Sequence, residues 1–392
     1  MKAKRDMTSS MPGMKKSREL DFRTGKFIAA AVVAILAGPA FASDAPTRQF
    51  AVIDPLAGQS PEQRHALDLA VGAGRIATVK TWSRRFSIRG KDYHYRLVGK
   101  SPDRGALTIP VDLVAIKLTV PDGPGGRTIV FDASDVVGHI VASPLFTPSP
   151  TLGNRQFGDA MLRSEFPNAS PDWHTLLNAS TGNVIEIIAP PGTVKIRQAK
   201  SGKYFGFITD SSIVNKPIGA YLRAVGSPGT IAVFITYNSV EKFAYGYHSW
   251  RWGDRSKTGI DIYMYSSWME DIDDVLGFPS PDAATLSHEV VETLHDPLIS
   301  SVTREWGDPF DRNRCFDRLI EVGDAVEDAG LHKVYTKEEG TLDGAPFDFT
   351  VQNMALLPWF TRENPSSALN GAYSFPVEGI LTKPAPMHCV TK

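Results

Sequence analysis

Cysteine is scarce in this sequence, which places only Cys315 and Cys389 among its 392 residues. Two isolated cysteines cannot supply a four-cysteine zinc site, and they do not form the CxxC pattern of a thiol redox protein. The residues around Cys315 also lack the motif of a cysteine nucleophile. We therefore expect neither zinc binding by cysteine nor a catalytic thiol.

An excess of charge of one sign is also missing. The chain has 42 Lys and Arg against 43 Asp and Glu, which leaves a formal charge of −1. Proteins that bind nucleic acid or anionic membranes by electrostatic attraction carry a basic excess. We expect no nucleic-acid partner and no stable membrane association of the mature chain.

Residues 1–42 have the pattern of a signal peptide. A basic stretch precedes the apolar run "FIAAAVVAILAGPAFA", which ends in Ala40-Phe41-Ala42, a small-x-small cleavage pattern. The run is short for a transmembrane span and is interrupted by Gly38 and Pro39, although an uncleaved anchor remains the alternative. This pattern predicts export to the periplasm or the extracellular space, where Cys315 and Cys389 are expected to form a disulfide rather than remain free thiols.

The remaining chain predicts an α+β protein with two parts. Short β-like runs separated by Gly, Pro and Asp turns fill residues 75–142, which indicates a β-rich N-terminal module over 43–148. The stretch "SPLFTPSPTLG", residues 143–153, is the predicted boundary. Residues 149–392 mix helical and strand patterns and are expected to form the second, α+β domain.

The stretch "PDAATLSHEVVETLHDP", residues 281–297, predicts a helix. Ser280 and Pro281 suit a helix cap and first turn, and Pro297 predicts an end near His295 or Asp296. Apolar residues gather on one side of this helix and polar residues on the other. His288 and Glu292 are four residues apart, so they share a face.

This helix suggests a metal site. An imidazole and a carboxylate at i and i+4 can bind one ion as the two histidines of HExxH do, and Glu289 would then be the base that takes a proton from metal-bound water. The alternative is a surface helix with solvated glutamates.

A third ligand must come from another segment, and "RLIEVGDAVED" offers Glu321 and Asp324. Glu321 is the preferred ligand, with Asp324 bracing His288, although the roles can be exchanged. His295 and Asp296 are expected to lie too far along a straight helix from His288 to join it, so Asp296 is an alternative third ligand only if the helix breaks early. His248, in the aromatic "GYHSW", is a candidate for orienting substrate or stabilising an oxyanion, or else a hydrogen-bonded wall residue.

Several stretches resemble a family of secreted, zincin-like bacterial proteins. They are "GKDYHYRLVGKSP", "ASPLF", "RQFGDAMLRSEF", "GYHS", "LSHEVVETLHDP", "LIEVGD" and "FTVQNMALLPWF". The resemblance implies that the SHEVxE helix and the EVGD segment form one metal site, carried here by His288, Glu289, Glu292 and Glu321 or Asp324. The family's helix tends to end in Asp-Asp-Pro, so His295 departs from the pattern.

The sequence thus predicts a secreted zinc-dependent hydrolase acting on a peptide or protein substrate, with a β-rich N-terminal module and a zincin-like α+β domain. One imidazole and two carboxylates are not exclusive to zinc, so another divalent cation is possible. The alternative is an exported, non-catalytic binding or cell-surface protein with a structural ion at the same residues.

Overall fold

The computed structural model describes residues 50–52, 55, 61–242, 244–253, 258–271, 273–276, 280–316, 318–327, 329–330 and 334–387. The predicted signal peptide and Cys389 lie outside these residues, so export and the disulfide stay predictions. The described residues all belong to one compact unit that runs from Asp44 to Lys392. Within them, no helix is both long and apolar enough to cross a membrane.

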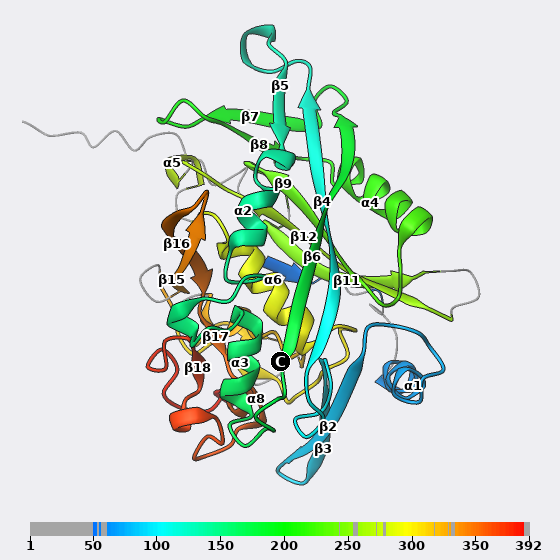
Figure 1. Ribbon diagram of the computed structural model, residues 1–392, viewed down its shortest axis with the longest axis vertical. Coiled ribbons are helices and arrows are strands. Elements are labelled where there is room, and N and C mark those ends of the chain that lie inside the picture. The colour runs from blue at the N-terminus through cyan, green and yellow to red at the C-terminus, as the bar shows by residue number, and fades with distance from the viewer. Residues whose placement is uncertain are drawn as a thin grey trace, which may run out of the picture. The chain divides into compact units, whose positions relative to one another are not determined.

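A mixed seven-stranded sheet organises this unit (Figure 1). Its order is β1-β11-β12-β9-β4-β5, and β6 pairs with the free side of β4. The strands are β1 (Phe50–Val52), β4 (Leu107–Val120), β5 (Ile129–Asp132), β6 (Thr175–Ile188), β9 (Ile231–Tyr237), β11 (Gly246–Trp252) and β12 (Ile260–Trp268). With the helices described below, the fold class is mixed α+β, as predicted.

The predicted boundary after residue 148 does not separate two modules. Strand β4 precedes the boundary, yet it runs parallel to both β6 and β9, which follow it. The supposed linker is packed: Leu145 and Phe146 are buried in the main core. The Pro and Ser residues of this stretch therefore mark turns inside one unit, which corrects the two-part division.

Helices cover both faces of the sheet. Helix α6 (Ala284–His295) lies against β11 and β12 on one face, and α4 (Ser212–Val225) packs on the other face through Val214, Ile218 and Leu222. Side chains of a strand alternate between faces. Trp250 of β11 therefore joins the core on the α6 side, whereas Tyr247 joins the core on the α4 side.

Smaller elements enclose α6 away from the sheet. The hairpin β15 (Tyr335–Leu342) and β16 (Ala345–Gln352) and the hairpin β2 (Thr81–Ile88) and β3 (Lys91–Val98) both contribute a strand that contacts it. Helix α1 (Pro61–Gly72) lies beside β2 and β3 (Figure 1). The other elements are α2 (Val137–Ala142), α3 (Phe157–Glu165), β7 (Val194–Gln198), β8 (Tyr204–Ile208), β10 (Ser239–Glu241), α5 (Asp273–Leu276), β13 (Trp306–Gly307), β14 (Cys315–Phe316), β17 (Met354–Ala355), α8 (Leu357–Thr361), β18 (Ser374–Phe375) and short 3-10 turns.

The predicted helix exists but begins later than expected. Asp282 has a positive φ of 43° and bridges to Met269, so the chain turns there and α6 begins at Ala284. Its end at His295 agrees with the prediction. All twelve residues of α6 are buried, so the alternative of a surface helix with solvated glutamates is wrong.

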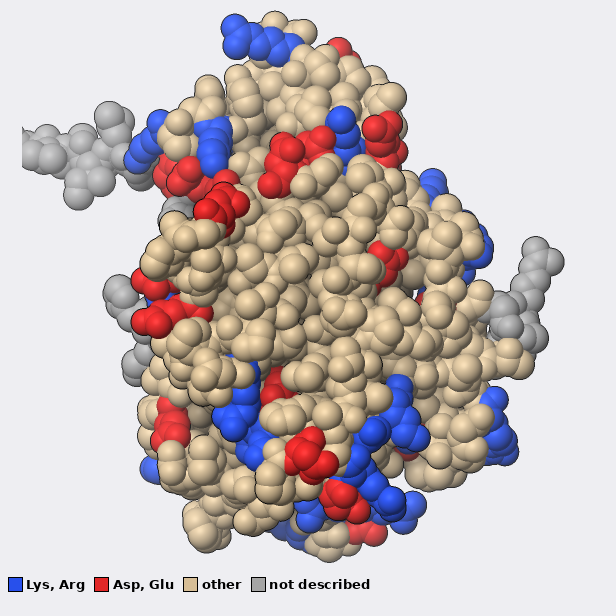
Figure 2. All heavy atoms as spheres, in the orientation of Figure 1, with Lys and Arg blue, Asp and Glu red and all other residues tan. Residues whose placement is uncertain are grey.

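The surface in Figure 2 shows a wide band with few charged side chains, and toward its lower edge Lys and Arg lie next to Asp and Glu. On this face the described residues form no large patch of a single sign.

Candidate metal centre

Three segments far apart in the sequence bring their titratable side chains together on the α6 side of the sheet. His288, Glu289 and Glu292 come from α6 and His248 comes from β11. Glu321 and Asp324 come from the turn that leads into the 3-10 helix Asp324–Val326. All six sequence-predicted site residues therefore lie within one cluster.

His288 and Glu292 make the shortest contact of the cluster. The Nε2 atom of His288 lies 2.9 Å from Oε2 of Glu292 and 3.7 Å from Oδ1 of Asp324. Burial alone would lower the pKa of His288, but the charge and hydrogen bond of Glu292 outweigh it and raise the pKa to about 10. A positive charge at Nε2 is therefore strongly favoured here.

Gln352 fixes the orientation of the His288 ring from its other side. The amide of Gln352 donates from Nε2 to the Gly323 carbonyl at 2.8 Å, so its Oε1 accepts a hydrogen bond from His288 Nδ1 at 3.0 Å. Because Nδ1 carries a proton, Nε2 of a neutral His288 ring would have only a lone pair, and this lone pair would point at the Glu292 carboxylate. A proton or a cation must lie between them, and this is the arrangement of a metal-binding histidine with an outer partner.

Of the two roles that the sequence left open for Asp324, ligand or brace of His288, its position favours that of a ligand. Gln352 holds Nδ1, whereas Asp324 lies on the Nε2 side beside Glu292. Burial, with the neighbouring charges of Glu292 and Glu327, raises the pKa of Asp324 well above its usual value. Sequence reasoning missed Gln352 because a single glutamine on a predicted strand has no recognisable spacing from the helix.

His248 lies inside the cluster rather than at a distant wall. Its Nδ1 atom is 3.3 Å from Glu289 Oε2 and 3.5 Å from Glu292 Oε2, and its Nε2 atom is 3.9 Å from Glu321 Oε2. Burial lowers the pKa of His248, but the hydrogen bond to Glu289 and the charge of Glu292 give a net rise. This position makes His248 a candidate ligand in addition to the orienting role that the sequence suggested.

Glu292 is shared between two groups of possible ligands. One group joins it to His248 and Glu289, and the other joins it to His288 and Asp324, with the ligand atoms of each group within 4.8 Å of one another. Its second oxygen, Oε1, accepts the backbone N–H of Gly323 at 2.9 Å. The carboxylate is thus held with Oε2 toward both imidazoles.

Two glycines leave room for these side chains. A Cβ atom at Gly323 would lie 2.4 Å from His288 Nδ1, and one at Gly246 would lie 2.8 Å from Glu289 Oε1. Both distances are shorter than any real van der Waals contact, so these positions exclude larger residues because of the site. The stretches "EVGD" and "GYHS" contain these glycines, but no sequence pattern reveals what each one faces.

His295 is the last residue of α6 and Asp296 follows it; neither was expected to reach the ion from a straight helix. His295 turns away from the cluster and contacts Glu165 Oε2 through Nε2 at 3.0 Å. Asp296 accepts hydrogen bonds from the backbone of Ser300 and Ser301 through Oδ1, and burial raises the pKa of this carboxyl to about 7. Neither belongs to a group of possible ligands among the described residues.

The donor set suits zinc. Imidazole nitrogens and carboxylate oxygens are zinc ligands, and the cluster offers two of the former and four of the latter. The number of oxygens also suits manganese or calcium. No family model, curated protein or solved structure matches the chain, so the centre is defined by its own geometry.

Proposed function

We propose that this protein is an exported, zinc-dependent hydrolase, a peptidase in the first instance, whose zincin-like domain carries the metal on α6. The observation that carries the proposal is the meeting of four carboxyl groups and two imidazoles in one cluster, in which every member except the partly exposed Asp324 is buried. Buried carboxylates at this density need a compensating positive charge. A divalent cation held by His288, Glu292 and Asp324, whose ligand atoms lie within 4.8 Å of one another, would supply it. Glu321, the ligand preferred from the sequence, belongs to neither group of possible ligands and faces His248 Nε2 at 3.9 Å instead.

The hydrolytic part of the proposal rests on Glu289. Its Oε1 has no hydrogen-bond partner among the described residues, while Oε2 faces His248. Burial raises the pKa of Glu289 to about 6, close to neutrality, which suits a group that takes up and returns a proton. Bound zinc would polarise a substrate carbonyl and lower the pKa of a bound water.

One observation favours the second candidate, a structural ion in a non-catalytic exported protein. His288 and Glu289 are fully buried, and His248 and Glu292 are nearly so. Six protein donors are also enough to close a coordination sphere, whereas a catalytic zinc keeps one position open. In that case removal of the ion would destabilise the fold, and no substrate would be turned over.

Metal content and peptide hydrolysis of the purified full chain distinguish these functions. We expect zinc in the parent and in Glu289→Gln and reduced zinc in Glu292→Ala. Of these three proteins, only the parent should have full peptidase activity. Glu289→Gln should lose at least about 100-fold in rate, the contribution typical of a general base. Glu186→Ala, on an exposed part of β6, should match the parent in both measurements.

Zinc that is bound without turnover, together with a large fall in melting temperature on chelation, would establish the structural ion instead. A parent that takes up no divalent cation would overturn both candidates.

A further inference from the structure

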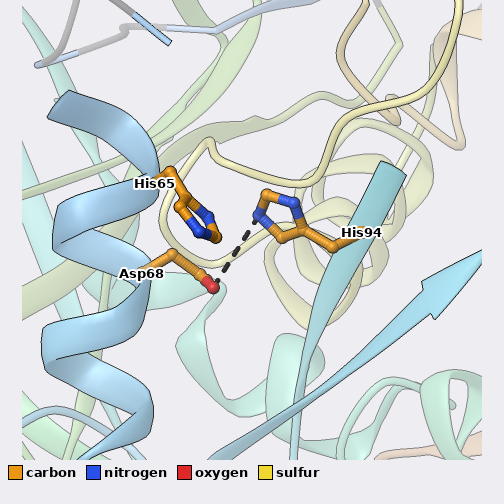
Figure 3. A group of neighbouring side chains, drawn as sticks. All are labelled: His65, Asp68 and His94. Atoms are coloured by element: carbon orange, nitrogen blue, oxygen red, sulfur yellow. Dashed lines mark ion pairs between the residues drawn. The ribbon is translucent and has the colours of Figure 1, made fainter. Parts of the chain in front are cut away.

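A second histidine and carboxylate cluster lies between α1 and the β2–β3 hairpin. His65 and Asp68 are three residues apart on α1, so they point from the same face, and His94 comes from β3. Figure 3 shows the two α1 side chains directed toward the imidazole of His94. One ligand atom from each of the three lies within 4.8 Å of the others.

Arg96 fixes the two sides of this cluster relative to each other. This buried guanidinium donates from Nε to Asp68 Oδ1 at 2.5 Å and from NH2 to the Asp68 carbonyl at 2.9 Å. A Cβ atom at Gly72, the last residue of α1, would lie 3.1 Å from Arg96 NH2, so the helix packs closely on this side chain. The contacts hold α1 against β3 and leave Asp68 Oδ2 directed toward His94.

The spacing between Asp68 and His94 suits an ion between them. His94 Nε2 lies 3.7 Å from Asp68 Oδ2, which is too long for a hydrogen bond, and this buried Nε2 has no hydrogen-bond partner among the described residues. Two ligands of a tetrahedral zinc with bonds of about 2.1 Å are separated by roughly 3.4 Å. His65 is exposed, so rotation of its side chain can bring its ring to the same point.

The cluster opens onto a cavity of about 690 Å³. His65 and His94 line it, together with residues of β2 and β3 and of the segment after α6. The backbone N–H of Val302 in that segment donates to the His94 carbonyl at 2.9 Å, which holds the histidine at the cavity wall. An ion at the cluster would therefore have its remaining coordination positions toward this cavity.

We propose that His65, Asp68 and His94 form a second divalent-metal site, selective for zinc or a similar transition metal, with open positions toward the cavity. Two imidazoles and one carboxylate are a donor set used by zinc sites that keep a position for water or another ligand. Four basic side chains line the cavity, Arg64, Arg85, Lys91 and Arg318, against two acidic ones, Asp92 and Glu305. Arg318 is paired with Glu305 at 2.7 Å, and Arg64 donates to the Ile299 carbonyl at 3.1 Å. These charges favour an anion as the additional ligand of the metal.

The test is a titration of the metal-free full chain with zinc, in which a chromophoric chelator reports the bound equivalents. We expect His65→Ala and His94→Gln each to lose about one equivalent relative to the parent. His65→Ala is the safer variant for folding because His65 is exposed. His139→Ala, which removes a partly exposed histidine of α2, is the matched control and should bind as the parent does.

The zinc content of Glu292→Ala distinguishes binding at this site from binding at the centre on α6. Two sites are supported if each histidine variant loses one zinc equivalent and Glu292→Ala, in which His65 and His94 are intact, also loses one equivalent. Unchanged zinc binding in both histidine variants overturns the second site, whatever Glu292→Ala does. Loss in the histidine variants alone leaves the second site standing and removes the first. Binding of inorganic phosphate without any zinc at the cluster would also overturn the proposal, since the cavity would then hold an anion only.

Discussion

At the scale of single residues, the candidate centre depends on groups that do not themselves contact an ion. Gly323 supplies a backbone N–H to Glu292, its carbonyl orients Gln352, and its missing side chain leaves space for the His288 ring. Gln352 then holds His288 from behind. Gly323 therefore affects the orientation of the His288 ring, the orientation of the Glu292 carboxylate and the space that the ring occupies.

Gly323→Ala should weaken zinc binding without unfolding the protein. The new methyl group would displace either the His288 ring or the turn, and loss of such outer contacts typically costs 10- to 100-fold in metal affinity, so we expect a decrease of about that size. Competition with a chelator of known affinity measures it. Gly138→Ala, in a helix with no atom within 4 Å of the new Cβ, is the control and should leave affinity unchanged. Equal affinity in the two variants would show that His288 does not need this space.

At the scale of elements, the entry of the chain into α6 is fixed by Asp282. Its Oδ1 accepts the backbone N–H groups of Ala283 and Thr350, and its Oδ2 accepts the Thr350 hydroxyl at 2.8 Å. One carboxylate thus joins the first turn before α6 to strand β16. Because β16 also carries Gln352, this junction sets the distance between the helix and its outer partner.

Asp282→Ala should destabilise the protein by about 2 to 4 kcal/mol, because two buried N–H groups and a hydroxyl would lose their acceptor. Asp282→Asn keeps an acceptor oxygen and should lose less. Urea denaturation measures both differences. Asp122→Ala, at an exposed turn, should change the free energy of unfolding by less than about 0.5 kcal/mol. A loss for Asp282→Ala no larger than that of Asp122→Ala would contradict this role.

The elements also show what the sequence can reveal. The spacing of His288 and Glu292 placed them on one helix face, because this pattern follows from local geometry. The start of α6 was missed because Ser280-Pro281-Asp282 has the composition of a cap, while tertiary hydrogen bonds to Thr350 place Asp282 in a turn. The positions of His248 and Gln352 depend on how strands pack against α6, which no local pattern contains.

At the scale of the whole molecule, buried acids outside the metal centre make stability depend on pH. Glu241 of β10 is fully buried, and burial raises its pKa to about 7, although hydrogen bonds from Ser211 and Tyr247 act in the opposite direction. The folded protein therefore retains this proton at pH values where the unfolded chain has lost it.

We expect the contribution of Glu241 to the free energy of unfolding to be complete below about pH 4.5 and to decrease as the pH rises toward 7, by at most about 3 kcal/mol. Glu241→Gln removes the titration, so its unfolding free energy should fall less over this range than that of the parent. Urea denaturation at pH 5 and pH 7.5 gives the comparison. Parallel pH profiles for the two proteins would mean that Glu241 ionises in the folded state as it does in water.

The pairing of β4 has a consequence for the order in which the chain folds. One edge of β4 is completed by β6, while Val111–Ala115 on the other edge pair with Ile231–Ile235 of β9, on the order of a hundred residues later. During synthesis β4 is therefore complete long before β9 has been made, and its apolar side chains point to both faces of the future sheet. Val111–Ala115 must therefore stay unpaired along this edge until more than half of the chain has been made, although β5 can already pair with Lys117–Val120. The cluster around His248 and His288 can assemble only after that.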